Sequence, residues 1–469
     1  MVKGGMMCLW HLGGIIGKGI FAGGLRGGPG LISIAKDAQQ KYKEKLMTPR
    51  EAVTGIESGS TIVQPLGAGE PPALLAAIAG AVSAGELRNI TMHAMLPLTN
   101  TLKTVLRSDL PPEIKWESYF FSGVDRKAYK EGRATYTPNL FHQAPRIFTE
   151  FRTIDTAIAT VSPMDRHGCF SLGVSVDYTL EVCRQARQLI VEVNPNMPRI
   201  HGAGFLHIDE VDAIIEHEAP LVELDPPVFG SEEERIGQLI AEMIPNGATL
   251  QLGIGGIPSA VTKYLMDHKD LGIHTEMMSD SLMELILAGV ATGRCKSIHK
   301  HKAVISFATG TRRLYDFLDD NPMVEALPVQ YVNAPAVIAQ NHKQVAINAA
   351  LQVDLTGQCC AESFGVQQYS GTGGQLDFTR GAFDSPGGMA IIAFNSTAKG
   401  GTISRIVPTL SPGAVVTTPR TDVHYVVTEY GVAQLKGKSL TERARLLIDL
   451  AHPKFREALR SEARHIGLI

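Results

Sequence analysis

A glycine-rich segment at Gln251–Ala260, QLGIGGIPSA, is the strongest local signal for chemistry in the 469-residue chain. A predicted strand runs into the glycines, and Pro258 marks the first turn of a helix. Glycines let the backbone approach a ligand closely, and N–H groups at a helix start favour anions or developing oxyanions. We expect residues 253–257 to do this, with Gly256 in a conformation that a Cβ would resist. The alternative is a plain strand-to-helix turn, and the pattern is not GxGxxG.

A carboxylate, Glu276, follows the glycine segment in an apolar setting. It stands between Ile273 and the pair Met277–Met278, at the end of a predicted strand. Carboxylates seldom occupy such places unless they are paired or take part in chemistry. The pattern therefore predicts a reactive group, and a buried ion pair is the alternative.

Two more segments carry groups that suit a site. Closely spaced glycines in Tyr369–Ala382 precede Asp377 and Arg380, which predicts a loop that backs an active site with ion pairs behind it. Lys399 lies between small residues in Ser396–Gly401, where it could contact a phosphate or simply be a solvated surface lysine. Whether this loop and this lysine belong to a site depends on the strands and helices that position them.

The histidines of His299–Lys302, HKHK, raise the question of a metal. No acidic or cysteine partner follows at ligand spacing. We therefore expect a solvated basic strand edge and no metal site.

The elements that must position these groups are written twice in the sequence. Three pairs of segments, 188, 189 and 201 residues apart, match in the same order: Gly59–Gly67 with Gly247–Gly255, Asp165–Gly168 with Asp354–Gly357, and Leu189–Asn194 with Met389–Asn395. The repeat predicts an N-terminal domain over 47–225 and a C-terminal domain over 226–469, joined near Glu216–Glu234. Aligning Ile90 with Ile273 places His93 opposite Glu276, so only the second half would carry the carboxylate.

Apolar, β-rich runs alternate with helical patterns in both halves. The strands are predicted at 61–63, 157–161, 189–193, 249–252, 303–307, 390–394 and 425–428, and helices at 72–82, 233–244 and 259–266. Continuous apolar strands between helices indicate sheets covered on both faces, so the fold class is α/β. A capping box at Ser439–Glu442 opens a helix up to about Ala451, and Pro453 begins another.

Composition limits the classes of partner. The net charge is −3, which lacks the basic excess of a nucleic-acid reader. The six cysteines form no CxxC pattern, which is typical of reduced thiols. Residues 1–46 are predicted as a leader or disordered extension, and translation from near Met47 is an alternative for it. No membrane span is predicted, and we expect a cytoplasmic protein, or a mitochondrial one if the acid-free residues 1–36 are a presequence.

Longer motifs resemble those of a known family. The chain resembles the acetyl-CoA hydrolase/transferase family of CoA-transferases, most closely its 4-hydroxybutyrate CoA-transferases, from about residue 40 to the C-terminus. The matching motifs are Ser162–Gly168 (SPMDRHG), Phe170–Asp177 (FSLGVSVD), Glu192–Pro198 (EVNPNMP), Gly253–Pro258 (GIGGIP), His274–Met277 (HTEM), Gly373–Phe378 (GGQLDF), Ala398–Gly401 (AKGG) and Thr428–Gly431 (TEYG).

This resemblance implies roles for individual residues. Glu276 matches the family's catalytic glutamate. Residues matching CoA contacts are Gly253, Ile254, Gly255, Gly256, Ile257, Asn333, Gly374 and Lys399. The implied fold is two related α/β domains with the active site between them, and a homodimer is expected. CoA would be a co-substrate, with no permanently bound cofactor.

The implied chemistry needs only the glutamate. A carboxylate is ionised at neutral pH, so it can attack a thioester without a paired base. The expected reaction moves CoA between short-chain carboxylic acids, such as 4-hydroxybutyrate or butyrate and acetate, through a glutamyl-CoA thioester at Glu276. Hydrolysis of a short acyl-CoA is the close alternative, and a non-catalytic CoA sensor is a third.

Overall fold

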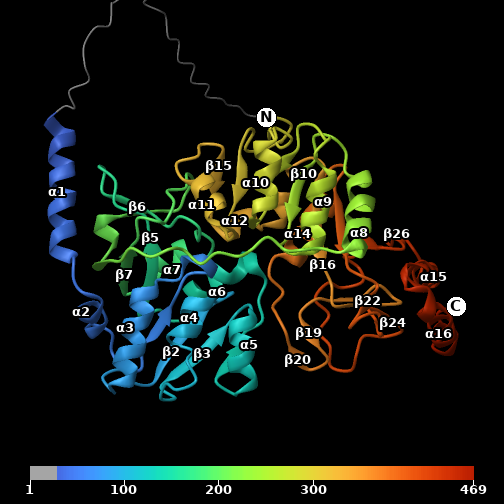
Figure 1. The fold of residues 1–469 in the computed structure, drawn as a ribbon, viewed down its shortest axis with the longest axis horizontal. Helices are drawn as coiled ribbons and strands as arrows, with labels where there is room; N and C mark the ends of the chain where they lie inside the picture. Colours follow the sequence, from blue (N-terminus) through green and yellow to red (C-terminus); the bar gives the residue numbers. More distant parts are fainter. Residues whose placement is uncertain (1–28) are drawn as a thin grey trace, which may run out of the picture.

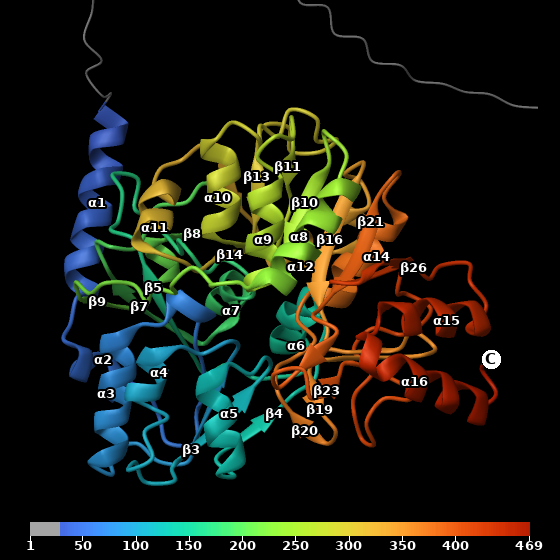
Figure 2. The same ribbon diagram turned by 45° about the vertical axis from the view of Figure 1, so that its right-hand side comes forward.

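The computed structural model describes residues 29–469 (Figure 1). The first half of the chain, blue to green, and the second half, yellow to red, lie against each other, with α1 (Pro29–Lys45) and α16 (Pro453–His465) at opposite sides of the molecule (Figures 1 and 2). No helix in the described part of the chain is both long and apolar enough to cross a membrane.

The first half is built on a seven-stranded parallel sheet in the order β4-β3-β2-β1-β5-β7-β9. The strands are β1 (Thr61–Val63), β2 (Ile90–Ala94), β3 (Ile114–Ser118), β4 (Ala134–Tyr136), β5 (Thr156–Val161), β7 (Gln188–Val193) and β9 (Ala213–Glu216). The helices are α1, α2 (Pro49–Thr54), α3 (Pro72–Ser83), α4 (Thr99–Lys103), α5 (Gly123–Lys130), α6 (Ala144–Glu150) and α7 (Thr179–Gln185), with 3-10 turns at Gly67–Gly69, Phe141–Gln143 and Ile208–Glu210. A separate antiparallel pair is formed by β6 (Cys169–Ser171) and β8 (Phe205–His207).

The second half is built on a six-stranded sheet in the order β11-β10-β16-β21-β25-β26. Its strands are β10 (Thr249–Leu252), β11 (Gly272–Ile273), β16 (Gln344–Ala349), β21 (Met389–Ala393), β25 (Tyr425–Thr428) and β26 (Gly431–Gln434), of which β26 alone is antiparallel. The main helices are α8 (Ser231–Met243), α9 (Gly256–Tyr264), α10 (Asp280–Leu287), α11 (Arg312–Leu318), α14 (Gln375–Asp384), α15 (Leu440–Leu450) and α16.

Smaller elements complete the second half. They are the short helices α12 (Val329–Val332) and α13 (Pro335–Ile338) and the short strands β12 (Met277–Met278), β13 (Ala303–Ile305), β14 (Phe307–Ala308), β15 (Val324–Ala326), β17 (Gln352–Asp354), β18 (Cys359–Cys360), β19 (Ser363–Phe364), β20 (Gln367–Gln368), β22 (Thr397–Ala398), β23 (Ile403–Ser404) and β24 (Ile406–Val407).

The two sheets share one topology, which accounts for the sequence repeat. The order β2-β1-β5-β7-β9 in the first half has its counterpart in β11-β10-β16-β21-β25 in the second. Both sheets are covered by helices and their strands are apolar, so the predicted α/β class with two similar domains is confirmed. The predicted strands and helices are present with ends that agree to within three residues, except that the run at 303–307 is split into β13 and β14.

One detail of the predicted alignment is wrong. His93 pairs with Val63, and continuation of the β10–β11 register places His274 level with Gln251, which is the counterpart of Val63 in the repeat. His93 therefore corresponds to His274 and not to Glu276. Two positions beyond His93 the first half has a methionine, so the carboxylate still belongs to the second half alone.

Helix α1 occupies part of the segment that we expected to be a leader or extension. Tyr42 donates a hydrogen bond to Glu216 at 2.7 Å, and Lys45 Nζ donates to the carbonyls of Ile208 and Val211 at 2.8 and 2.5 Å. These contacts fix the end of α1 to the first sheet. The rest of that expectation, for residues 1–28, lies outside the described residues.

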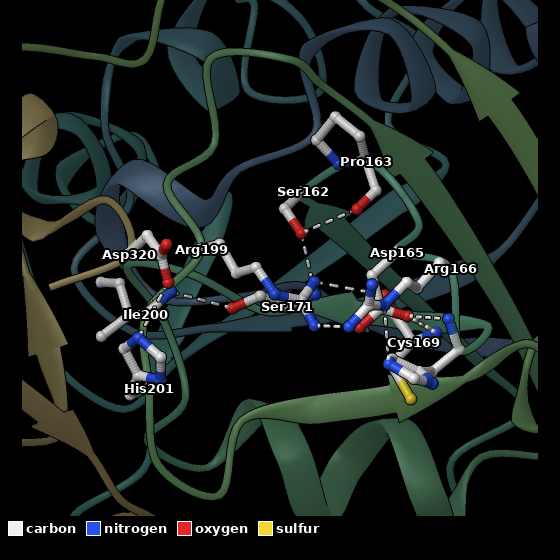
Figure 3. A network of polar contacts seen from close by, with 11 residues as sticks. Ser162, Pro163, Asp165, Arg166, Cys169, Ser171, Arg199, Ile200, His201 and Asp320 are labelled. Carbon is white, nitrogen blue, oxygen red and sulfur yellow. Dashed lines mark hydrogen bonds and ion pairs between the residues drawn. The ribbon is translucent and has the colours of Figure 1, made fainter. Parts of the chain in front are cut away.

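The first half is tied to the second through residues 199–203. Arg199 binds Asp165 through Nη2 at 2.5 Å, and its carbonyl accepts the Asp320 N–H at 2.8 Å. His201 Nε2 lies 2.9 Å from Asp320 Oδ1, and the His201 carbonyl accepts the N–H of Ala326 at 2.8 Å. Figure 3 shows this network running from the loop before β6 to Asp320 in the second half. The motif around Asp165 therefore positions Arg199, and the segment from Arg199 onward makes the bonds to the second half.

Candidate active site

Glu276 lies between β11 and β12, and its backbone is fixed from both sides. Its carbonyl accepts N–H donors from Ser306 and Phe307, each at 2.9 Å. The Ser306 carbonyl in turn accepts the N–H groups of Val176 and Asp177 of the first half, each at 3.2 Å. A segment of the first half therefore supports the strand pair that carries Glu276.

The Glu276 carboxylate is partly buried and meets two other residues that the sequence singled out. Asn333 Nδ2 donates to Glu276 Oε2 at 2.7 Å, from its position directly after α12. Gly374 lies so close that a Cβ there would overlap both Glu276 Oε2 and Asn333 Nδ2. The structure thus brings Glu276, Asn333 and Gly374 together, and it requires glycine at 374.

Gly374 is also the N-cap of α14, a helix of ten residues. Its position places the N-terminus of α14 beside the Glu276 carboxylate. N–H groups at a helix N-terminus and the helix dipole favour negative charge there. The arrangement can therefore stabilise an oxyanion that develops at this point.

The protonation of Glu276 differs from the expectation of an already ionised carboxylate. Burial raises the pKa of Glu276 to about 7, the hydrogen bond from Asn333 lowers it, and the charge of Asp377 raises it. At pH 7 roughly half of the molecules would carry the ionised form. The ionised form of Glu276 therefore becomes the main form only above about pH 7.

The loop at residues 371–374 is backed by the first half. Phe141 donates its N–H to the Gly373 carbonyl at 3.2 Å, and the Phe120 ring lies over Gly373. Asp377 is buried and pairs with His142, whose Nδ1 lies 2.7 Å from Asp377 Oδ1. The predicted ion pairs behind the loop are present, since Arg380 pairs with Asp422 at 3.3 Å.

The residues from the first half were not found from the sequence. His142 and Phe120 belong to no repeat and to no recognisable motif. Their role depends on contacts with residues more than 200 positions away, as the His142–Asp377 pair shows. No signal in a single sequence marks such a pair.

The glycine loop at 253–257 joins β10 to α9. The Thr275 hydroxyl donates to the Leu252 carbonyl at 3.4 Å, which links the start of the loop to the residue before Glu276. Gly255 has φ +122°, while Gly256 has no positive φ and is the first residue of α9. The glycine whose backbone conformation a Cβ would resist is therefore Gly255, and the expectation for Gly256 is wrong. A Cβ at Gly256 would instead meet Phe229 Cβ at 3.2 Å and Glu233 Cγ at 3.3 Å.

Two further expectations concern single residues. Lys399 is exposed in the turn between β22 and β23, with φ +50°, and makes no hydrogen bond or ion pair with Glu276, Asn333 or Gly374 among the described residues. His299 bonds to Glu325 at 2.9 Å and to the Tyr331 hydroxyl at 2.7 Å, so it lies in a polar cluster and not on a solvated strand edge. Within residues 29–469, no group of three or more metal-ligating side chains could hold a metal ion.

Comparison with known proteins identifies the family to which the chain belongs. Sequence models of the acetyl-CoA hydrolase/transferase N-terminal and C-terminal domains match residues 33–224 and 310–463. The chain belongs to the acetyl-CoA hydrolase/transferase family. Two curated relatives are the succinyl-CoA:cyclohexane-1-carboxylate CoA transferase of Geobacter metallireducens, 47% identical over 92% of this chain and 98% of that protein, and the 4-hydroxybutyrate coenzyme A transferase of Clostridium kluyveri, 48% identical over 90% and 98%.

A solved structure has the same fold as this chain. RipA from Yersinia pestis superposes with a TM-score of 0.89 at 46% identity, over 92% of this chain and all of that one. The predicted resemblance, the CoA-transferase fold and the CoA-transferase class of enzyme are therefore confirmed for this member of the family.

Proposed function

We propose that this enzyme moves CoA between short-chain carboxylic acids with Glu276 as the nucleophile. The observation that carries the proposal is the position of the Glu276 carboxylate, against Asn333 and at the N-terminus of α14. A lone carboxylate in that environment has an oxyanion site beside it and no neighbouring base that it would need.

The reaction would pass through a glutamyl-CoA thioester. The Glu276 carboxylate attacks the acyl-CoA carbonyl, the C–S bond of the tetrahedral adduct breaks, and CoA leaves as a thiolate, so that a mixed anhydride of Glu276 and the acyl group is formed. The thiolate then attacks the Glu276 carbonyl of the anhydride, which releases the first acid as its carboxylate and leaves CoA on Glu276. A second carboxylate attacks this thioester, and the same two steps in reverse release its CoA ester and restore Glu276.

The groups around Glu276 would stabilise the charge that develops. Each attack makes a tetrahedral oxyanion, and backbone N–H groups at Gly374 and in the loop 253–257 are the available donors. We propose that Gly253, Ile254, Gly255, Gly256 and Ile257, together with Asn333, Gly374 and Lys399, contact CoA. The exposure of Lys399 and of its turn would let that lysine meet a phosphate of CoA from solvent.

For the acids we propose 4-hydroxybutyrate or butyrate as donor and acetate as acceptor. The names of relatives support short acids, including a butyryl-CoA:acetate CoA-transferase of Anaerostipes caccae at 41% identity. Hydrolysis of a short acyl-CoA is the second candidate, because water could replace the acceptor acid at the same Glu276 thioester. Exclusion of water from the site would decide between them.

Further parts of the proposal concern organisation. We place the domain boundary between residues 225 and 226, in the stretch from 217 to 230 that contains no helix or strand. We also propose a homodimer in the cytoplasm, with no permanently bound cofactor. Sedimentation of the purified protein would test the dimer.

Trapping the thioester tests the central step. The protein is incubated with acyl-CoA, reduced with borohydride and digested, and the Glu276 peptide is weighed by mass spectrometry. A reduced Glu276 supports the proposal, whereas an unmodified peptide overturns it. Rates of CoA release with and without acetate then separate transfer from hydrolysis: release that is equally fast without acetate identifies the hydrolase.

A further inference from the structure

His274, two residues before Glu276, has a fully buried ring at the centre of the candidate site. Its Nε2 lies 2.8 Å from the Val332 carbonyl, and its exposed fraction is 0%. A carbonyl oxygen only accepts hydrogen bonds, so Nε2 carries the hydrogen. The ring therefore holds the last residue of α12 in a fixed position relative to the Glu276 strand.

The held carbonyl belongs to the residue that precedes Asn333. The Asn333 N–H donates to Val329 at 2.9 Å, so its backbone closes the α12 turn, and its side chain donates to Glu276 at 2.7 Å. The path from His274 through Val332 to Asn333 thus ends on the carboxylate itself. Movement of the Val332 carbonyl would move the donor that Glu276 accepts.

The same ring also touches the helix that ends beside the carboxylate. His274 and Phe378 pack edge to face with their ring centroids 6.3 Å apart. Phe378 lies in the first turn of α14, and its N–H donates to the Gly374 carbonyl at 2.9 Å. One side chain therefore contacts both neighbours of the Glu276 carboxylate, the Asn333 turn and the α14 N-terminus.

The surroundings of His274 keep the ring neutral. Burial, and then the charge of Lys296, lower the pKa of His274 to about 3; the hydrogen bond to the Val332 carbonyl raises it and His299 lowers it. Lys296 is itself buried and donates to the carbonyls of Ile273 and Lys302, each at 2.8 Å. Glu325 is the acidic group whose charge acts on Lys296, and it pairs with His299 at 2.9 Å. Across the working pH range the ring therefore remains a fixed donor and does not titrate.

We infer that His274 is a positioning residue that sets the geometry of the Glu276 carboxylate through Asn333 and Gly374. This inference rests on the proposed role of Glu276 as nucleophile. The His274 ring would thus affect the reaction although it does not contact the reacting atoms. Misplacement of a catalytic group by about 1 Å can cost 10²-fold in rate, so a small shift would have a large effect.

Two substitutions separate hydrogen bonding from packing. In His274→Leu the donor is lost but the volume stays apolar, whereas in His274→Gln an amide N–H can reach the Val332 carbonyl. We expect kcat to fall about 10- to 100-fold in the Leu variant, with KM for acyl-CoA within about threefold, and to be largely restored in the Gln variant. The acid limb of kcat/KM should move up by about half a pH unit to one unit in the Leu variant, because the bond that lowers the pKa of Glu276 is weakened.

A double-mutant cycle tests the path. On an Asn333→Ala background, His274→Leu should lower kcat by less than a further threefold. The reason is that the Asn333 side chain, through which His274 would act, is already absent. His93→Leu is the matched control, because His93 is buried at the equivalent strand position and does not contact Asn333. It should lower thermal stability without moving the acid limb.

The outcomes against the inference are distinct. An unchanged acid limb in His274→Leu, failure of the Gln variant to restore kcat, or full additivity with Asn333→Ala would each overturn it. If His274→Leu does not fold, the Gln variant decides. An unimpaired His274→Gln supports the donor role, and a Gln variant that folds but loses kcat as severely as Asn333→Ala overturns it.

Borohydride trapping on the wild type separates the two proposals. An unmodified Glu276 rejects its role as nucleophile. A trapped thioester in the wild type, together with an unchanged acid limb in His274→Leu, rejects only the role of His274.

Discussion

The Nδ1 atom of His142, in the first half of the chain, lies 2.7 Å from Oδ1 of Asp377 in the second. The His142 N–H also donates to Asp377 Oδ2 at 3.1 Å. Asp377 lies in α14 and its charge raises the pKa of Glu276. The protonation of the candidate nucleophile therefore depends on a carboxylate that is held by the other domain.

Neutralising Asp377 should shift the pH dependence of the reaction. In Asp377→Asn the amide can still bond to His142, but the negative charge near Glu276 is gone. We expect the acid limb of kcat/KM to move to lower pH, by about half a unit. Initial rates from pH 5.5 to 9 measure this. A shift to higher pH would mean that Asp377 acts on Glu276 through geometry and not through charge.

The pH dependence of the wild type follows from the same pKa. Because burial raises the pKa of Glu276 to about 7, kcat/KM should rise with pH below 7 and level off above it. A profile that is flat from pH 5 to 9 would contradict a nucleophile with this pKa.

Removing the carboxylate should abolish turnover and leave the fold intact. Glu276→Ala has no nucleophile, and we expect no activity above background. Glu276→Asp withdraws the carboxylate by one methylene, and a loss of about 10²-fold is expected from the altered attack geometry. Circular dichroism controls for folding. An Ala variant that turns over acyl-CoA at the wild-type rate would rule out this nucleophile.

Glu276→Gln should reveal the free-energy cost of the buried charge. The folded-state pKa is raised above the ordinary value near 4.5, so the folded protein holds the proton more tightly. The wild-type unfolding free energy therefore falls as pH rises from about 4.5 to 7, by roughly 3 kcal/mol. We expect the Gln variant to melt at nearly the wild-type temperature at pH 5 and several degrees above it at pH 8. Equal differences at both pH values would contradict the raised pKa.

Gly255 and its counterpart in the repeat form a matched pair. Gly255 has φ +122° and Gly67, 188 residues earlier, has φ +56°. An alanine at either position is strained by its backbone and should cost about 1–3 kcal/mol of stability. Only Gly255→Ala should also lower kcat/KM by about tenfold or more, because the C-terminal loop is the proposed CoA contact. Equal activity losses in the two variants would mean that both loops serve the reaction.

The main strands and the carboxylate could be predicted because each has a local signature. The predicted strands are apolar runs, and Glu276 is a charged residue inside such a run, which is unusual. The alignment of His93 with Glu276 failed because the connections between the paired strands differ in length: His93 lies 30 positions after Val63, whereas His274 lies 23 positions after Gln251. A repeat recognised at one strand therefore loses its register at the next.

Backbone angles and contacts between the halves could not be predicted in this way. The glycine pattern marks the loop at Gly255 but does not say which glycine takes the positive φ, since that depends on where α9 begins. The support of Asp377 by His142 depends on the packing of two distant segments. Such contacts are properties of the folded chain, and a local pattern does not contain them.

One apolar core runs through both halves, from Val63 in β1 to Val427 in β25. Neither half buries its share of this surface alone, and residues such as Gly202, pressed against the Ala326 backbone, admit no side chain at the seam. Cooperative unfolding in a single thermal transition is the thermodynamic consequence. A fragment cut at the boundary would therefore expose an apolar face that promotes aggregation.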